Sequence, residues 1–225
     1  SRGQPLTLST QIPMRMGYEF LGWAENPTAE MPRYLPGEIY TAGRDITLYA
    51  VWRRAKVTYT VRHYQQGLSG DTEYLLSGEE HLSAYAGEKV SPAVRNYIGF
   101  TSPEIQTVTI SADGTTIVSY YYTRNCYTLH LEQGEGFSGV TGAGQYSYGQ
   151  QVSFAATLKK GYRFVGWKRE GVLFDGRVNV TLTMPAESVT FVACAQRDTS
   201  TGGCPFEDAE NHWAREAICY VWERD

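Results

Sequence analysis

The heptad GYRFVGW at residues 161–167 has a second copy, GYEFLGW, at residues 17–23. Both copies read G-Y-x-F-x-G-W, so the tyrosine and the phenylalanine share one face of an extended chain. The first glycine permits the turn that begins the strand, and the second lets the backbone bend so that the tryptophan folds onto the same face. Each aromatic side chain can bury about 150–250 Å². The pattern predicts the core of a small repeated domain, formed by Tyr18, Phe20, Trp23, Tyr162, Phe164 and Trp167.

The two tryptophans of the heptads also fit a second interpretation, a platform on which a sugar stacks. The C–H face of a pyranose packs well on an aromatic ring. However, Trp23 and Trp167 lie inside the repeat motif among alternating apolar residues. Burial in the core is therefore the favoured interpretation.

Matched blocks flank each heptad. Upstream, GQQVSF at residues 149–154 corresponds to GQPLTL at residues 3–8, and downstream, VTFVA at residues 189–193 corresponds to ITLYA at residues 46–50. A fainter copy of the same order lies at residues 87–122. Three blocks in constant order indicate tandem modules of about 70 residues.

These repeats predict module boundaries. We place a first module at residues 1–55, a second at 56–125, a third at 126–198, and a linker with a short C-terminal segment at 199–225. The third module opens with a strand, CYTLHL, that precedes its Gly149 block, whereas the first module begins directly at the equivalent of that block. We therefore expect the first module to lack its first strand.

Composition narrows the class of protein. The 225 residues include 17 Tyr and 23 Gly, and 13% of them are aromatic, which suits β structure with tight turns and small cores rich in large rings. The net charge is −4 and no basic stripe is visible, which argues against nucleic acid and anionic membranes as partners. No apolar run reaches the roughly 18 residues that a membrane span needs.

Residues that carry chemistry are scattered. The spacing of the four cysteines matches no zinc pattern, and it leaves free thiols or one disulfide open, with three pairings allowed. The four histidines are dispersed, and no serine lies in a G-x-S-x-G setting. We expect no metal, no cofactor and no catalytic residues, so the chain is not predicted to be an enzyme. The cysteines are Cys126, Cys194, Cys204 and Cys219.

The sequence offers one candidate ligand surface, the run Tyr120, Tyr121 and Tyr122. Consecutive residues of a strand point to opposite faces, so at least one hydroxyl should meet solvent or a neighbouring module. Packing between modules and plain exposure are the alternatives to ligand binding.

The C-terminal segment has a different pattern. Asn211 is a suitable N-cap, and Trp213, Ala217 and Tyr220 recur at helical spacing. The pattern predicts one short helix, which is too short to bury its apolar face alone. We expect it to be an incomplete element that stops at Asp225.

These motifs resemble known families. The first and third modules resemble the internalin-type B-repeat, also called the Listeria–Bacteroides repeat, through the heptads and their flanking blocks. The second module is similar to mucin-binding-protein-type repeats through YTVRHYQQ at residues 59–66 and YYYTR at residues 120–124. The C-terminal segment resembles the opening of an S-layer homology repeat, at Phe206, Asp208, His212, Trp213, Ala214 and Ile218.

The resemblances imply a mainly β (α+β) chain of small β-grasp-like, or ubiquitin-like, modules in an elongated array. They also imply an extracellular, wall-attached protein of Gram-positive bacteria, whose complete S-layer region would bind a cell-wall polymer. We expect a non-catalytic stalk that presents a distal domain. The alternatives are an adhesin whose modules bind host glycan, mucin or protein, and an accessory region of a larger surface enzyme.

Overall fold

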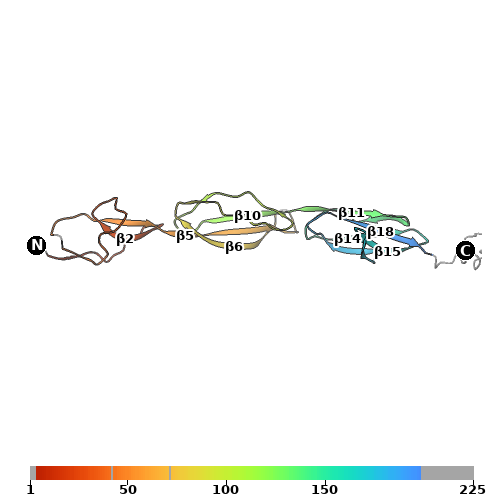
Figure 1. The fold of residues 1–225 in the computed structure, drawn as a ribbon, viewed down its shortest axis with the longest axis horizontal. Helices are drawn as coiled ribbons and strands as arrows, with labels where there is room; N and C mark the ends of the chain where they lie inside the picture. The colour runs from red at the N-terminus through yellow and green to blue at the C-terminus, as the bar shows by residue number, and fades with distance from the viewer. Residues whose placement is uncertain (1–3, 42, 71, 199–225) are drawn as a thin grey trace, which may run out of the picture. The chain divides into compact units, whose positions relative to one another are not determined.

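The computed structural model describes residues 4–41, 43–70 and 72–198, and all regular secondary structure in these ranges is β-strand (Figure 1). Two compact units divide the chain, Ser1–Thr123 and Arg124–Asp225. Every ladder between the described strands joins strands of the same predicted module. The chain is therefore mainly β, with several small sheets in tandem modules. The helix expected near the C-terminus lies outside the described residues.

The first module contains two small antiparallel sheets. In one sheet β1 pairs with β3, and in the other β2 pairs with β4. The second pairing carries the heptad, and its register shifts between Phe20 and Gly22. The strands are β1 (Leu6–Thr7), β2 (Tyr18–Ala24), β3 (Ile39–Tyr40) and β4 (Tyr49–Arg54).

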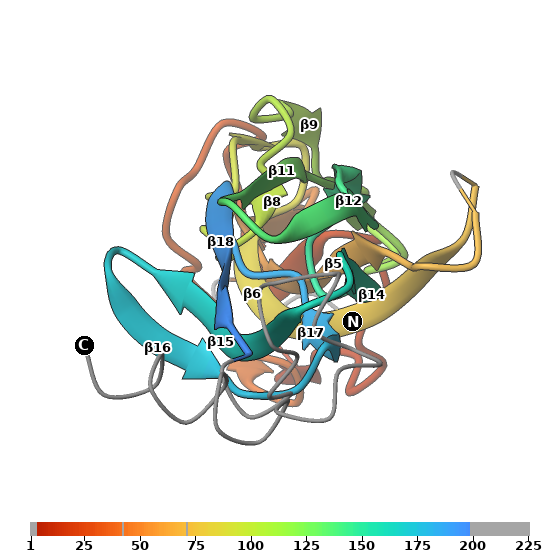
Figure 2. The ribbon, with the colours of Figure 1, turned by 90° about the vertical axis from the view of Figure 1, so that its right-hand side faces the viewer.

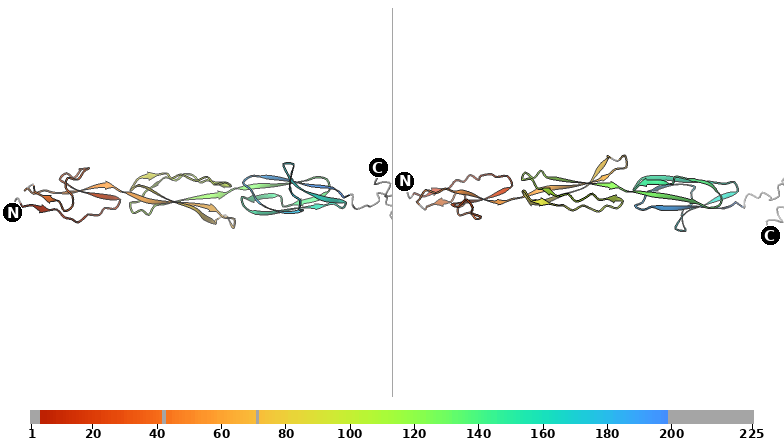
Figure 3. Two further views of the ribbon diagram at one scale, coloured as in Figure 1. Left: turned by 60° about the horizontal axis from the view of Figure 1, so that its bottom comes forward. Right: turned by 90° about the horizontal axis from the view of Figure 1, so that it is seen from above.

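The second module is built on a long antiparallel hairpin of β5 and β6, drawn in orange and yellow in Figure 3. The last long strand, β10, lies beside β5 and runs parallel to it. Its sheet has the order β6-β5-β10-β8, and a small sheet of β7 and β9 completes the module. The strands are β5 (Lys56–Gln66), β6 (Tyr74–Tyr85), β7 (Lys89–Val90), β8 (Phe100–Thr101), β9 (Val108–Thr109) and β10 (Ile117–Arg124).

The third module has two sheets, of order β13-β11-β18-β15-β16 and β12-β14-β17. Its first strand, β11, runs parallel to its last strand, β18, and Figure 2 shows the β15–β16 hairpin in cyan beside β18 in blue. The strands are β11 (Cys126–Gln133), β12 (Phe137–Thr141), β13 (Gly144–Ser147), β14 (Gln151–Leu158), β15 (Tyr162–Arg169), β16 (Val172–Asp175), β17 (Asn179–Thr183) and β18 (Val189–Arg197).

Both heptads form the same strand pair but differ in burial. Trp167 is fully buried, and its indole Nε1 donates a hydrogen bond of 3.1 Å to the carbonyl of Val178. Its ring meets that of Phe154 edge to face, with 4.9 Å between centroids. Trp23 contacts Phe20 in a similar way at 5.0 Å but is only partly buried. The tyrosine and the phenylalanine of each heptad are also partly buried.

Candidate functional site

The tyrosine run lies in β10 and alternates between the two faces of its sheet. Tyr120 and Tyr122 are fully buried, whereas Tyr121 is 50% exposed. The Tyr120 hydroxyl donates a hydrogen bond of 2.6 Å to the carbonyl of Pro92 and accepts one of 3.2 Å from the amide of Gln106. The expectation of a ligand surface made of all three residues is thus wrong for Tyr120 and Tyr122, which belong to the core.

The inner face of this sheet holds a buried polar cluster that sequence reasoning missed. The Tyr122 hydroxyl accepts a hydrogen bond of 2.7 Å from the amide of Arg95 and lies 2.8 Å from Nδ1 of His63, which is fully buried. Because this hydroxyl can donate its own proton to Nδ1, a neutral His63 carries its hydrogen on Nε2. Nε2 lies 3.4 Å from Oε1 of Glu80, but the two are not aligned for a hydrogen bond.

Burial, hydrogen bonds and neighbouring charges set the protonation of the cluster. Burial lowers the pKa of His63 from its ordinary 6.5, and the nearby Arg95 guanidinium lowers it as well, against an opposing effect of Glu80. The hydrogen bonds from Arg95, of which the Nε bond is 2.8 Å, lower the pKa of Glu80. His63 is therefore neutral at pH 7 and Glu80 is ionised. The His63 imidazole and the Tyr122 ring are both fully buried, so the cluster is part of the interior of the second module.

The outer face of the same sheet gathers three tyrosines from three strands, which we call the tyrosine patch: Tyr64 in β5, Tyr74 in β6 and Tyr121 in β10. The rings of Tyr64 and Tyr121 stack at 5.1 Å with 14° between their planes, because parallel pairing sets these residues side by side. Tyr74 meets Tyr121 edge to face at 5.2 Å. Such a patch can stack a sugar ring or an apolar peptide side chain. The alternation of strand residues predicted that at least one tyrosine of the run would face outward, but it did not predict the two partners of Tyr121, which come from strands distant in the sequence.

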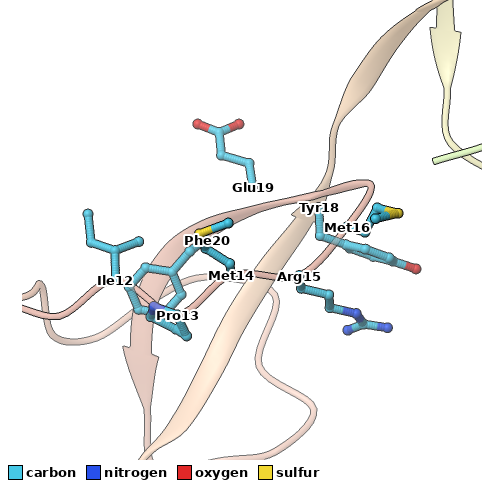
Figure 4. Close-up of a pocket in the computed structure, with 8 residues that line it drawn as sticks. All are labelled: Ile12, Pro13, Met14, Arg15, Met16, Tyr18, Glu19 and Phe20. Atoms are coloured by element: carbon cyan, nitrogen blue, oxygen red, sulfur yellow. The ribbon is translucent and has the colours of Figure 1, made fainter. Parts of the chain in front are cut away.

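A pocket of about 650 Å³ lies in the first module, along residues 12–20 (Figure 4). The ring of Phe20 lies near Pro13, and Glu19 points the other way. The guanidinium carbon of Arg15 lies 3.8 Å from the centroid of the Tyr18 ring, a cation–π contact. The pocket is mostly apolar and open, with three strongly exposed apolar side chains at its rim: Ile12, Met14 and Met16.

In the described part of the chain, the remaining candidates are separate side chains. Cys126 and Cys194 are free thiols, and among residues 4–41, 43–70 and 72–198 no group of three His, Cys, Asp or Glu side chains is arranged to hold a metal ion. No helix long and apolar enough to cross a membrane occurs in the same ranges. Two of the cysteines and all residues of the S-layer motif lie outside the described residues, namely Cys204, Cys219, Phe206, Asp208, His212, Trp213, Ala214 and Ile218.

Comparison with known proteins identifies the repeats at both ends of the described chain. Residues 1–51 match the Listeria-Bacteroides repeat domain, and residues 127–194 match the divergent InlB B-repeat domain. The chain thus carries one domain of each kind. Both are non-catalytic repeats typical of bacterial cell-surface proteins.

Comparisons with curated proteins and with solved structures identify no further domain. A search of curated proteins finds no match to this chain. Among solved structures, the Bacillus anthracis TIE protein is similar with a TM-score of 0.43 and 9% identity. The match covers 71% of this chain and 36% of that protein, so this chain spans about a third of the length of its structural relative.

Proposed function

We propose that this chain is a non-catalytic, load-bearing spacer of a wall-attached bacterial surface protein. The observation that carries the proposal is the pairing of the first and last strands in the second and third modules. β10 pairs with β5 at six positions and β18 pairs with β11 at five, in both cases in parallel. The same pairing, with the mainly β content, supports a β-grasp-like assignment of these modules.

Parallel pairing fixes how a module bears tension. The chain enters the module at the start of its first strand and leaves at the end of its last strand. In a parallel pair these two points lie at opposite ends of the ladder. Tension therefore slides the strands along each other and loads all backbone hydrogen bonds of the ladder together, whereas tension at one end would break them in turn.

Short junctions fit the same role. A single residue, Ala55, separates β4 from β5, and a single residue, Asn125, separates β10 from β11. A junction of one residue leaves few backbone angles free, so it adds little flexible length between the modules. The proposed anchor is the S-layer homology segment, which in complete form would bind a cell-wall polymer and hold the spacer outside the cell.

Single-molecule pulling of the third module tests this proposal. Handles on Cys126 and on Arg197→Cys load the β11–β18 ladder along the strands. Handles on Cys126 and on Ser188→Cys load the same ladder from one end, because the amide of Thr128 lies 3.0 Å from the Ser188 hydroxyl. In both chains alanine replaces the other cysteines. We expect a several-fold higher rupture force in the first geometry, and equal forces would refute a load-bearing ladder.

The tyrosine patch favours a second candidate function, an adhesin that binds host glycan, mucin or protein through the second module. Its support is the stack of the exposed Tyr121 on the half-buried Tyr64. An array of mucin-type glycans, wall polymers and matrix proteins, probed with the whole chain, tests it. A saturable hit that Tyr121→Ala abolishes and Tyr49→Ala, another exposed tyrosine, leaves intact would establish the adhesin. No binding by the folded chain would exclude it for the ligands on the array. If the complete polypeptide holds a catalytic domain, the chain is instead an accessory region of a surface enzyme.

A further inference from the structure

The third module carries exposed apolar side chains on a strand at the edge of its sheet. β16 is the last strand in the order β13-β11-β18-β15-β16, so its backbone pairs with β15 on one side and with no described strand on the other (Figure 2). Val172, Leu173 and Phe174, which we call the apolar run, are consecutive in β16 and are 71%, 58% and 44% exposed. An exposed apolar edge strand is a template for pairing with another strand.

The opposite edge of the same sheet has a different character. β13 has the sequence GQYS, and three of its four residues are partly buried. The ring of Tyr146 packs against the core, and its hydroxyl donates a hydrogen bond of 2.8 Å to the carbonyl of Gly142. The exposed apolar run is therefore a property of β16 and not of the whole sheet.

Two exposed charges of opposite sign flank the apolar run. Glu170 lies three residues before Leu173. Arg177 lies three residues after Phe174, so the two charges are equally far from the middle of the run. Their side chains are 85% and 75% exposed, and both are accessible to a second molecule.

The contacts of these charges within the chain leave room for further partners. Arg177 donates to Asp175 from Nη2 at 2.7 Å and from Nε at 3.1 Å. An arginine has five N–H donors, so this pair does not exhaust it. The carboxylate of Glu170 lies 4.0 Å from Nε of Arg169, which is too long for a hydrogen bond.

Antiparallel pairing of two copies would bring the opposite charges together. When two β16 edges run in opposite directions about a two-fold axis at the middle of the apolar run, Glu170 of each chain comes within one residue of Arg177 of the other. Parallel pairing would instead place each charge beside its own kind, which is unfavourable. The charges therefore favour a second copy of this chain as the partner and the antiparallel direction for the pair.

We propose that the edge of β16 is a self-association site at which two copies of this chain pair antiparallel. The two apolar runs cover each other, and the sheet continues from one chain into the other. A pair of Glu170 with Arg177 at each end sets the direction of pairing. The contact is two-fold symmetric and therefore closes at a dimer. Because β16 has only four residues, the contact is small and the dimer dissociates readily. The site lies within the third module and does not depend on the spacer proposal.

Sedimentation equilibrium of the whole chain tests the site, with alanine in place of the cysteines so that no disulfide links two molecules. We expect a reversible monomer–dimer equilibrium. Leu173→Lys should raise the dissociation constant at least about tenfold, because apolar contact is lost and two like charges meet near the axis. Leu75→Lys, at a leucine that is 57% exposed on the edge strand β6, should leave the constant unchanged.

Charge reversal tests the direction of pairing. Glu170→Lys and Arg177→Glu should each weaken the dimer several-fold, because each sets like charges against each other. An equimolar mixture of the two variants should recover the association of the parent chain, because every reversed charge then meets its opposite. If Arg177→Glu does not fold, the comparison of Leu173→Lys with Leu75→Lys still decides. Three results would each overturn the proposal: a chain that is monomeric at every concentration, a dimer that Leu173→Lys leaves intact, or a mixture of folded variants that associates no better than its components.

Discussion

The first and third modules carry the same heptad in the same strand register, yet they bury it to different extents. Trp167 is fully buried, and Trp23 is only partly buried. Each heptad pairs with its closing strand through the same bulge, so residues within this strand pair determine that local geometry. Burial depends on strands from elsewhere in the module. The third module supplies Phe154 against Trp167, whereas the first has the smaller Leu8 at the equivalent position.

The largest expected effect is the loss of the buried tryptophan. Trp167→Ala should cost about 3–5 kcal/mol and unfold the third module, because a fully buried ring and its indole hydrogen bond are both removed. Trp23→Ala should cost the first module clearly less. Denaturant titration followed at module-specific methyl signals measures both. An unchanged midpoint for Trp167→Ala would show an accessible ring and revive the sugar-platform interpretation.

Substitution of the bulge glycines is expected to destabilise the first module more than the third. This is the reverse of the order expected for the two tryptophans. Gly22 and Gly166 have φ of 143° and 149°, a conformation that other residues adopt only with strain of order 1–3 kcal/mol. A Cβ at Gly22 would lie 2.6 Å from the backbone oxygen of Tyr34. At Gly166 its nearest contact is the flexible tip of Leu173, and the nearest backbone atom, the oxygen of Asp175, is farther away at 3.0 Å.

Alanine at each bulge tests this reversal. Both variants should lose stability, and Gly22→Ala should lose more than Gly166→Ala, because a backbone oxygen yields less than a leucine methyl. Thermal melting of each module gives the order. If Gly166→Ala is the more damaging change, the bulge in the third module is set by packing that the close contacts do not reveal.

Lowering the pH should destabilise the second module more than the third. The pKa of His63 is lowered in the folded state, so the unfolded chain binds a proton first as pH falls below 6.5. The stability of the second module should therefore be complete above pH 6.5 and decline below it, by at most about 1.4 kcal/mol per pH unit. Below pH 4.5 the lowered pKa of Glu80 adds to the loss.

Unfolding at a series of pH values measures this decline. His63→Gln should flatten it between pH 6.5 and 5, while His81→Gln, at an exposed histidine, should not. His130 of the third module is also exposed, so that module should not show the same decline. Parallel curves for His63→Gln and the parent chain would contradict the role given to His63.

The smallest effect is expected at the exposed ion pair across β2 and β4. Arg53 and Glu19 are 2.7 Å apart, but their side chains are 64% and 55% exposed. Surface pairs of this kind contribute little. Arg53→Gln should leave the melting temperature of the first module unchanged within error. A clear loss would mean that the pair holds an edge that lacks other support.

Periodicity and the repeats made part of this molecule predictable. They predicted a β-rich chain and the block order that links the two heptads, because both follow from local spacing. The tyrosine run was harder. Alternation predicted one exposed tyrosine, but the partners of Tyr121 come from β5 and β6.

The buried cluster could not be predicted either, because its residues come from strands that are far apart in the sequence. His63 and Tyr122 are 59 residues apart, and they meet only because β5 and β10 belong to one parallel sheet. Nothing in the sequence near His63 sets it apart from the exposed histidines except its place at an alternating inward position.

Hydrogen exchange of the backbone amides across the whole chain tests most directly the claim that a parallel first strand secures the heptad core. Residues 189–193 pair with β11, and their counterparts, residues 46–50, have no such neighbour among the described residues. We predict that exchange is slower at residues 189–193 by about a hundredfold or more, as expected for a secured core against an open edge. Equal protection of the two segments would contradict the account.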